Sequence, residues 1–346
     1  MLILAIETSC DETSASVVKD GIEVLSNVVS TSSNLFEETG GVVPEVAARK
    51  QVEYIVPVIQ KALAKASLDI EQIDSLAVTV GPGLVGSLLV GVTAVKTLSF
   101  IYNKPVIPVN HLLGHVYSVF ITEYLGKTVQ PKKPDFPNLV LVASGGHTDL
   151  ILLNDRTQVE YLGGTRDDAC GEAFDKVARV VGLSNYLGGP ILSKTALGSV
   201  KKYDFSFPRP MLNSGTYDFS FSGLKTAVIN YLQFDLQGRK LNKGEVANVC
   251  KEFEDSVTEV LLTKTLKAFN EFNPKSISVV GGVSANSKLR NVFTKEFGDK
   301  LFLPPLSLCG DNAAMIGCAA YYLQDLSTRD LSTLDANPGL SLEILG

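Results

Sequence analysis

The chain is poor in histidine and has no closely paired cysteines. Its 346 residues include only three histidines, and none of the five cysteines stands in the CxxC spacing of a zinc or redox site. An odd number of widely spaced cysteines also argues against a disulfide framework, so we expect free, buried thiols in a reducing compartment. The cysteines are Cys10, Cys170, Cys250, Cys309 and Cys318.

An excess of positive charge is also missing. The formal net charge is -6, so no overall basic field indicates nucleic acid, and an RNA partner would need a local basic patch or another subunit. The first apolar run, residues 2–6, is too short for a signal peptide, and no basic region precedes it. The most apolar long segment, residues 85–102, contains Lys96 and falls short of the ~20 apolar residues of a membrane span. We therefore expect a cytoplasmic protein without a membrane partner.

Strand and turn patterns occur twice along the chain, which is too long for one typical core. In both halves the first predicted hairpin has a polar tip, ETSCDETS in one and SGGH in the other. The pattern predicts an α/β protein whose halves share one architecture. The predicted strands include residues 2–6, 15–18, 22–30, 75–80 and 105–109, and then 158–164 after the hairpin 139–153; the predicted helices include 44–65, 85–102 and 170–182.

The Pro- and Lys-rich segment 126–138 is the predicted domain boundary. We expect residues 1–130 to form the first domain, joined by a C-terminal segment at about 311–346. The last helix of this segment is expected to start at Asp311, and the chain after about residue 326 is expected to be a loop. Residues 131–310 are expected to form the second domain. Residues 184–244 are rich in Ser, Tyr, Phe and Pro and fit the repeated pattern poorly. We interpret them as an insertion of short helices and loops, a kind of segment that is often functional.

Four glycine-rich turns are expected at the C-terminal ends of predicted strands. Glycine lets backbone N–H groups approach a phosphate, and ligands of open α/β sheets collect at the carboxyl edge of the strands. None of the turns matches GxxxxGKS/T or GxGxxG, so P-loop and Rossmann sites are disfavoured. Together they favour a nucleotide site of another kind over simple chain reversal. The turns are GPGLVG at 81–86, SGGH at 144–147, LGGP at 187–190 and GGVSAN at 281–286.

The acidic tip of the first hairpin can serve a ligand or can be a solvated turn. Its hydroxyls could bind phosphate, and its carboxylates could hold a cation or act as a general base. Neither alternative is excluded by residue type alone. The tip offers Glu7, Thr8, Ser9, Asp11, Glu12 and Thr13.

Two of the three histidines, His111 and His115, stand four apart in VNHLLGH. On a helix this spacing puts both rings on one face, where they could bind a metal. The zinc-protease signature needs a glutamate between the histidines, and here Leu112, Leu113 and Gly114 fill the gap. A protease therefore lacks its local base. Two imidazoles are half of a tetrahedral site, and His147 and Asp311 are candidate further ligands. A pair of hydrogen-bonded histidines, with Asp311 as a helix N-cap, is the alternative.

Local basic clusters lie at residues 132–133 and 201–202 and at Arg209 and Lys225. Aromatic residues interleave the later positions and could stack on the bases of an RNA loop. Packing in a core is the alternative. These aromatics are Tyr203, Phe205, Phe207, Tyr217, Phe219 and Phe221.

Ten segments occur in one order along the chain: IETSCDETSASVV, GGVVPEVAAR, GPGLVGSLLVG, NHLLGH, SGGHTDL, DDACGEAFDKVAR, FPRPM, DFSFSGLKT, GGVSANSKLR and CGDNAAMIG. With these segments the chain resembles, over nearly all of residues 2–324, the TsaD family of tRNA threonylcarbamoyladenosine modification proteins. The resemblance implies a two-domain fold of the actin/Hsp70/sugar-kinase (ASKHA) type. It also implies an acyltransferase that moves the threonylcarbamoyl group of threonylcarbamoyl-AMP to N6 of an adenosine. That adenosine lies 3′ of the anticodon in tRNAs reading codons that start with A.

The resemblance also implies site residues. One divalent ion per subunit, iron or zinc, is expected on His111, His115 and Asp311. Asp175 is expected to accept hydrogen bonds from ribose hydroxyls, and Asp11 and Glu12 are weak candidates for the general base. The adenylate is expected on Val142, Ala143, Ser144, Gly145, Gly146, Asp175, Gly189 and Asn286.

Three positions depart from the family pattern. Gln51 stands where many relatives have histidine, and Ser193 stands where some have an acid near the nucleotide. The segment before LGGP is one residue longer than usual, which favours Gly189 over Gly188 as the nucleotide-binding glycine.

The resemblance implies partners as well as tRNA and threonylcarbamoyl-AMP. A TsaB-like paralogue would form a heterodimer, and a TsaE-like ATPase would join it. Helices at residues 44–65 and 85–102 are natural surfaces for the paralogue, with a homodimer through the same helices as the alternative. Three other functions stay open at this point: an ATPase or kinase of the same fold, a metalloglycoprotease (an older label for such sequences), and a scaffold that only binds nucleotide.

Overall fold

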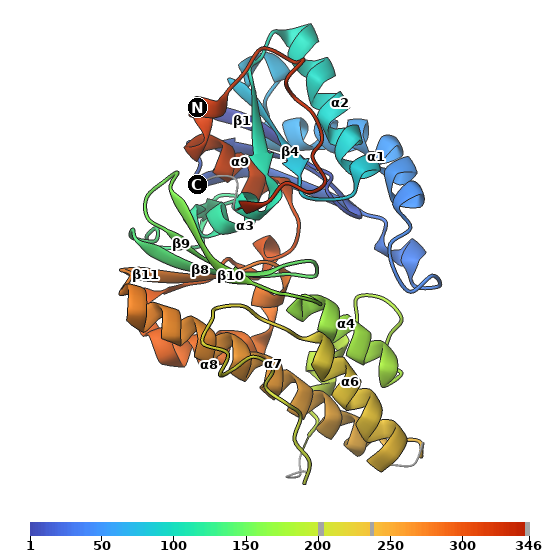
Figure 1. Cartoon of the computed structure of the whole chain (residues 1–346). Coiled ribbons are helices and arrows are strands. Elements are labelled where there is room, and N and C mark those ends of the chain that lie inside the picture. The colour runs from blue at the N-terminus through green and yellow to red at the C-terminus, as the bar shows by residue number, and fades with distance from the viewer. Residues whose placement is uncertain (200–203, 236–238, 343–346) are drawn as a thin grey trace. The chain divides into compact units, whose positions relative to one another are not determined.

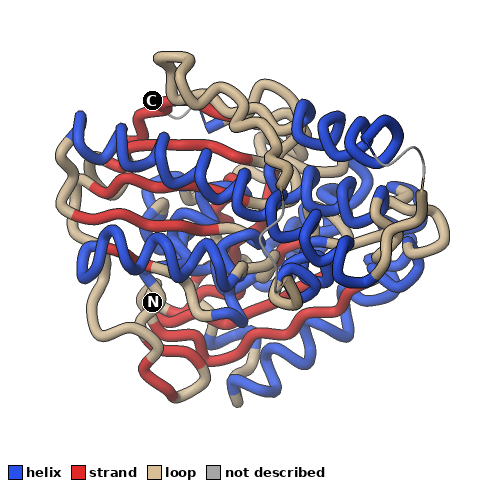
Figure 2. Tube along the Cα trace, turned by 90° about the horizontal axis from the view of Figure 1, so that it is seen from below, coloured by secondary structure: helices blue, strands red, loops and turns tan. Residues whose placement is uncertain are grey.

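The computed structural model describes residues 1–199, 204–235 and 239–342. The chain divides into two compact units, which we describe separately. Unit 1 comprises Met1–Phe136, Leu153–Glu160 and Pro304–Gly346, and unit 2 comprises Pro137–Leu152 and Tyr161–Leu303. Helical segments run alongside strands in the tube view, as an α/β sequence predicts (Figure 2).

The sheet of unit 1 has the strand order β5-β4-β1-β2-β3-β6-β7. β1 pairs antiparallel with β2, from Leu2 opposite Lys19 to Glu7 opposite Ser14, and it pairs parallel with β4 on its other side. The central strands are buried on both faces, which explains their nearly continuous apolar sequences. The strands are β1 Leu2–Glu7, β2 Glu12–Lys19, β3 Glu23–Thr31, β4 Ser75–Gly81, β5 Val106–Asn110, β6 Glu123–Tyr124 and β7 Lys127–Thr128.

The sheet of unit 2 repeats this arrangement. Its order is β10-β9-β8-β11-β12, which matches β3-β2-β1-β4-β5 strand for strand. β11 pairs parallel with both β8 and β12, as β4 pairs parallel with β1 and β5. The repeat predicted from the two hairpins is therefore confirmed. The strands are β8 Asn138–Ala143, β9 Thr148–Leu153, β10 Val159–Gly164, β11 Ser276–Val280 and β12 Leu301–Phe302.

Helices cover both faces of the unit 1 sheet. α1 (Pro44–Ala66) and α2 (Val85–Tyr102) pack against each other and the sheet, and α9 (Ala313–Tyr322) packs against β1, β2 and the short helix α3 (His111–Tyr117). Figure 1 shows α1 and α2 on one side of β1 and β4 and α9 on the other. α9 lies close to the strands because Gly317 faces them: a Cβ there would be 2.6 Å from Val18 Cγ2.

The C-terminal segment is less helical than the sequence predicted. α9 begins at Ala313 and not at Asp311, because the Asn312 side chain accepts a hydrogen bond from the Met315 N–H (3.1 Å) and so caps the helix. α9 ends at Tyr322, and a single 3-10 turn, Gln324–Leu326, and irregular chain follow. The helix is therefore shorter than the segment 311–346 assigned to it, and the loop predicted after about residue 326 is confirmed for the described residues. The sequence after Tyr322 lacks a helical apolar stripe.

The helices of unit 2 lie together beside its sheet (Figure 1). The longest of them, α7 (Lys243–Phe272, 30 residues), was not predicted. A capping box starts it, because the Glu245 N–H donates to Asn242 Oδ1 (3.0 Å) while the Asn242 N–H donates to the Glu245 carboxylate (2.8 Å). The other helices are α4 Cys170–Val180, α5 Gly189–Ala196, α6 Ser222–Asn230 and α8 Ser287–Phe297.

Short helical turns complete the description of the backbone. The 3-10 turns are Ser33–Phe36, Ile70–Gln72, Ser118–Phe120, Gly282–Ala285, Gly298–Lys300, Leu306–Leu308 and Gln324–Leu326, and Tyr231–Asp235 is a π-helical turn.

Each unit has its own apolar core. In unit 1 the core lies between the sheet and α1 and α2, with Leu4, Ile59 and Val95 at its centre. In unit 2 it lies between the sheet and α4, α7 and α8, with Phe253 and Phe293 fully buried. Burial of one such side chain contributes about 1.5–3 kcal/mol. The apolar cluster of each unit therefore stabilises that unit by itself.

The predicted insertion packs into the core of unit 2. Phe219 and Phe221 are fully buried, and the ring of Phe205 stacks on Tyr231 at 4.3 Å between centroids. The Arg209 guanidinium pairs with two carboxylates of α7. For Phe207, Phe219 and Phe221, which are buried, the packing alternative holds and the hypothesis that they stack on RNA was wrong. Tyr203 and the lysines at 201–202 lie outside the described residues.

Candidate functional site

The histidine pair begins α3 in unit 1. Asn110, the last residue of β5, turns the chain into α3, because its side-chain oxygen accepts hydrogen bonds from the Leu112 and Leu113 N–H groups (2.8 and 3.4 Å). His111 and His115 then lie one turn apart, as their spacing predicts. Their ring centroids are 4.8 Å apart and both side chains are buried.

Asp311 meets this pair from a distant part of the sequence. Its Oδ1 lies 3.1 Å from His115 Nε2 and 3.6 Å from His111 Nε2. Gly114 allows this approach, because a Cβ at Gly114 would lie 2.6 Å from Ile316 Cδ1 on α9. The close packing of α9 on α3 therefore sets the position of the aspartate that precedes α9.

The three side chains fit a metal ion. Their potential ligand atoms lie within 4.8 Å of one another, and they form the one such His/Cys/Asp/Glu group found in the described ranges. Both ring nitrogens of His115 are buried without a hydrogen-bond partner among the described residues, although Nε2 faces Asp311. Buried imidazole nitrogens are costly to leave unpaired, and two imidazoles plus a carboxylate are a common donor set for zinc and iron. The group could hold a metal.

Glu7 contacts Nδ1 of His111, whereas Asp311 lies near Nε2 of the same ring. The sequence did not reveal this contact of Glu7. The carboxylate is fully buried at the end of β1, and its Oε2 lies 3.1 Å from His111 Nδ1. It also accepts hydrogen bonds from the Thr79 hydroxyl and the Ser9 N–H, both at 2.5 Å. A carboxylate at Nδ1 favours the tautomer with its proton there, which leaves Nε2 to face Asp311 and His115.

The charges in this group shift one another's pKa values. Burial alone would lower the pKa of His111, but the carboxylates of Asp311 and Glu7 outweigh it and raise the pKa to about 9. Burial would raise the pKa of Glu7, but the neighbouring His111 lowers it below the ordinary value. Burial, together with Asp311 and Asp11, raises the pKa of Glu12 well above its usual range. Several carboxyl groups are therefore crowded together here, and a bound cation would relieve their mutual repulsion.

Asp11 lies in the loop between β1 and β2, and Glu12 is the first residue of β2. Side chains of α1 and α2 hold the backbone of this segment in place. Gln51 of α1 donates from Nε2 to the carbonyls of Cys10 (2.9 Å) and Glu12 (3.0 Å). Ser87 of α2 donates to the Cys10 carbonyl as well (3.2 Å). Gln51 thus supports the backbone of this segment.

Unit 2 contains a separate pocket of about 470 Å³. Of the residues expected to bind the adenylate, Gly145, Asp175, Gly189 and Asn286 line it. Val142 and Ala143 are buried in β8, and Ser144 and Gly146 belong to the turn after it without lining the pocket. The remaining wall is largely apolar, with one lysine and a few small polar groups, and it consists of Gly171, Phe174, Leu187, Pro190, Ser193, Lys194, Leu197, Gly282, Val283, Ala285 and Ser287.

The two glycines of LGGP do different work. The Gly189 N–H donates to Asp175 Oδ1 (2.9 Å), and a Cβ at Gly189 would keep ordinary contact distances of 3.5 Å or more. A Cβ at Gly188 would lie 2.3 Å from the Ala178 Cβ, so this glycine packs α5 against α4. Burial raises the pKa of Asp175 in spite of the backbone N–H groups of Gly189 and Gly188.

The turn after β8 is held against α4 by close backbone contact. The Gly171 N–H donates to the Ser144 carbonyl (3.2 Å), and a Cβ at Gly171 would lie 2.5 Å from that oxygen. The Cys170 N–H donates to the Thr148 hydroxyl (2.8 Å). Two of the first N–H groups of α4 are therefore already used. His147 lies on this turn in unit 2 and is not a member of the histidine–aspartate group.

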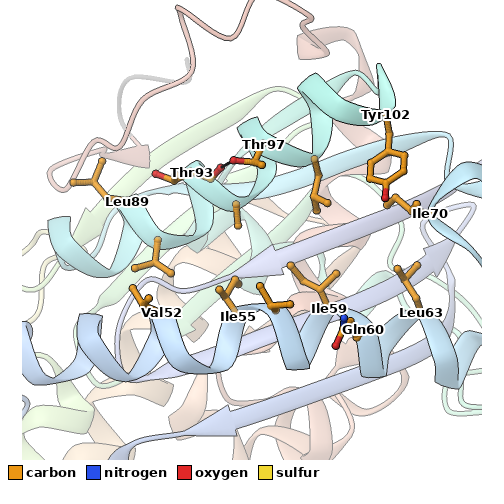
Figure 3. Close-up of a pocket in the computed structure, with 14 residues that line it drawn as sticks. Val52, Ile55, Ile59, Gln60, Leu63, Ile70, Leu89, Thr93, Thr97 and Tyr102 are labelled. Atoms are coloured by element: carbon orange, nitrogen blue, oxygen red, sulfur yellow. Dashed lines mark hydrogen bonds between the residues drawn. The ribbon is translucent and has the colours of Figure 1, made fainter.

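An apolar groove of about 660 Å³ runs between α1 and α2. Figure 3 shows Val52, Ile55 and Ile59 of α1 pointing toward α2. Several groove residues are well exposed, with Val52 at 63% and Val56 at 58%. By length and composition, α2 is also the one helix among the described residues that could cross a membrane, but core helices pass the same test, and 33% of α2 is buried in unit 1.

Known proteins resemble this chain over most of its length. The family model described as "TsaD: tRNA N6-adenosine threonylcarbamoyltransferase" matches residues 23–318. A protein of that function from Moorella thermoacetica is 49% identical over 339 residues, 97% of this chain and 95% of the relative. One from Ligilactobacillus salivarius is 48% identical over 349 residues, 99% of this chain and 97% of the relative.

Solved structures with little sequence identity show the same fold. Component A of (R)-2-hydroxyglutaryl-CoA dehydratase from Acidaminococcus fermentans has a TM-score of 0.53 at 15% identity, covering 94% of this chain and 99% of its own. Full-length HypF has a TM-score of 0.55 at 12% identity, covering 94% of this chain and 46% of its own. These are ASKHA-type folds, so the predicted fold class is confirmed. From its sequence relatives, the chain belongs to the TsaD family of tRNA N6-adenosine threonylcarbamoyltransferases.

Proposed function

We propose that the pocket of unit 2 binds the adenylate of threonylcarbamoyl-AMP and that His111, His115 and Asp311 bind one iron or zinc ion. The observation that carries this proposal is that a chain of this family has two candidate binding sites, a pocket in unit 2 and a group of possible metal ligands in unit 1. One is a pocket with apolar walls beside Asp175 and Gly189. The other is a buried histidine–aspartate group in which neither ring nitrogen of His115 has a hydrogen bond among the described residues. The substrate carries both a nucleotide and an acyl group, and the two sites offer chemistry suited to each.

The residues of unit 2 would position the nucleotide. The walls from Phe174 and Val283 exclude water from a base, and the Asp175 carboxylate accepts hydrogen bonds from ribose hydroxyls. Asp175 is itself fixed by the Gly189 N–H, so little reorganisation is needed when ligand binds. The proposal includes the domain boundaries expected near residues 130 and 310. With these boundaries, the residues that would bind the nucleotide all belong to the second domain.

The residues of unit 1 would act on the acyl group. A bound divalent ion supplies Lewis-acid polarisation and orientation of an oxygen ligand. Glu7 holds the proton at His111 Nδ1 and keeps Nε2 available. Asp11 and Glu12 are our candidates for accepting a proton from the attacking amine, since the Gln51 and Ser87 side chains fix their loop. The acceptor amine is N6 of the adenosine 3′ of the anticodon in tRNAs reading codons that start with A.

We also propose that the groove between α1 and α2 docks a TsaB-like paralogue, that a TsaE-like ATPase joins the assembly and that the chain works in the cytoplasm. The exposed apolar residues of the groove support the docking surface. A homodimer through the same groove is the competing arrangement. The substitution Val56→Glu puts a charge in the groove, and light scattering of the chain with and without the paralogue separates the two arrangements.

The direct test is threonylcarbamoyl transfer to a tRNA that reads codons starting with A, with the partners and threonylcarbamoyl-AMP supplied. The wild-type chain should give modified tRNA, while His111→Ala and His115→Ala should not. Absence of product with the wild type would refute the proposal. Steady ADP production without tRNA would favour the kinase alternative instead, and the missing glutamate between the histidines disfavours the protease alternative.

A further inference from the structure

Glu254 is a buried carboxylate next to the pocket of unit 2. It lies on α7, is only 3% exposed and does not line the pocket itself. Its Oε1 accepts a hydrogen bond from the Asn286 side chain, with 2.7 Å between the oxygen and Nδ2. A buried carboxylate needs such donors, so its position on α7 calls for an explanation.

The amide of Asn286 is fully specified by its neighbours. Its oxygen accepts from the Leu289 N–H (2.8 Å) and caps α8, while its nitrogen donates to Glu254 and to the Ser193 hydroxyl oxygen (2.8 Å). An amide nitrogen has two hydrogens, and both are used. A flipped amide would place its oxygen against the Glu254 carboxylate and its nitrogen against the Leu289 N–H, which is unfavourable at both ends.

The fixed orientation of the Asn286 amide also determines how the Ser193 hydroxyl is hydrogen-bonded. Ser193 and Asn286 both line the pocket. The Ser193 oxygen accepts from Asn286, and no described residue accepts the Ser193 hydroxyl proton. A hydroxyl has one donor hydrogen besides its two lone pairs. The proton of Ser193 is therefore available to a ligand in the pocket.

We propose that Glu254 is a positioning residue: it fixes the Asn286 amide, and through Asn286 it presents Ser193 as a hydrogen-bond donor to an acceptor atom of the bound nucleoside. The inference rests on the proposed nucleotide site and extends it to a residue on α7. It also gives Ser193 a defined role at a position where some relatives have an acid.

Calorimetric titration of the full-length chain with AMP tests this role. Glu254→Leu removes the acceptor and should weaken AMP binding about 10- to 100-fold. Glu254→Gln keeps a carbonyl acceptor and should stay within about 3-fold of wild type. Glu252→Leu is the matched control, because Glu252 is also buried on α7 (5% exposed) but accepts from the Phe207 N–H and Arg209. It should lose thermal stability without losing AMP affinity.

A double-mutant cycle with Ser193→Ala distinguishes positioning from simple destabilisation. The Ser193→Ala loss should be nearly absent in the Glu254→Leu background, because the two residues act on one contact. Additive losses, or wild-type affinity in Glu254→Leu, would overturn the inference. If Glu254→Leu does not fold, Glu254→Asp, which withdraws the carboxylate, replaces it in the same cycle. Failure of the wild type to bind AMP would refute the nucleotide pocket itself, a distinct result.

Discussion

The hairpin between β1 and β2 and the hairpin between β8 and β9 hold the same place in their sheets, yet their tips differ in chemistry. The first tip is acidic and closed: Gln51 and Ser87 donate to its carbonyls, and the side chains of Glu7 and Asp11 are buried. The second tip is open, because no described atom lies within 4 Å of a Cβ built on Gly145 or Gly146.

In the function proposed above, one architecture would serve two kinds of ligand. Carboxylates packed beside two histidines create a region that attracts a cation, whereas a glycine turn beside apolar walls leaves room for a nucleoside. The fold sets where the ligand can lie, and the residues at each tip set what that ligand is.

Loss of one of the proposed metal ligands should have the largest effect, and it should reduce both bound metal and threonylcarbamoyl transfer. His115→Ala or Asp311→Ala removes one of three donors, so bound metal should fall well below one ion per chain and transfer at least about 100-fold. Elemental analysis and the transfer assay measure the two effects. AMP binding in unit 2 should not change; a parallel loss of AMP affinity would show that the two sites are not independent.

A methyl group on Gly171 should disturb the turn after β8, which forms the second hairpin tip. In Gly171→Ala the new Cβ would meet the Ser144 carbonyl, a backbone atom that cannot rotate away. We expect a loss of about 1–3 kcal/mol in the free energy of unfolding, together with weaker AMP binding. Chemical denaturation measures the stability change. Gly223→Ala in α6, where no described atom lies within 4 Å, is the control and should be neutral or stabilising by up to about 1 kcal/mol.

Glu7→Gln should weaken metal binding at the first hairpin tip without removing any of the three proposed metal ligands. The amide can no longer accept fully from His111 Nδ1, so metal affinity should fall about 10- to 100-fold. Competition with a chelator gives the affinity. Glu53→Gln, an exposed acid on α1, provides the comparison and should bind metal like the wild type. Unchanged affinity in Glu7→Gln would contradict the supporting role of this carboxylate.

A pH titration should give the smallest effect. Burial raises the pKa of Asp175 above its ordinary value, so this carboxyl takes up a proton at a higher pH than an exposed aspartate. Because the ionised form accepts from ribose hydroxyls, AMP affinity should fall as the pH drops through the raised pKa. Calorimetry at decreasing pH follows the decline. Asp175→Asn should bind more weakly but show a flat profile in the same range, and a sloping profile in that variant would refute the assignment.

The strands and most helices followed from local pattern. Apolar runs with polar tips predicted β1, β2, β8 and β9, and the matching strand order confirmed the repeat. α7 was missed although Asn242 and Glu245 offer the N-x-x-E signal of a capping box. β6, β7 and β12 have two residues each, too few for any sequence periodicity.

The sites were predictable only as far as spacing and resemblance reach. The i,i+4 spacing placed His111 and His115 on one helix face. Glu7 could be recognised as an acid at a hairpin tip, but its contact with His111 depends on β1 lying near β5 through β4. Glu254 likewise meets Asn286 because α7 packs beside α8. Such contacts between distant segments have no local sequence signal.

The central claim is that this chain transfers the threonylcarbamoyl group with one metal ion on His111, His115 and Asp311. The most direct measurement is a reconstitution series. Metal-free chain, with its partners, threonylcarbamoyl-AMP and tRNA, receives increasing amounts of ferrous or zinc ion while modified tRNA is quantified. We expect activity to rise with occupancy and to level off at one ion per chain. Full activity in the metal-free chain, or in a His111→Ala/His115→Ala variant, would contradict the account.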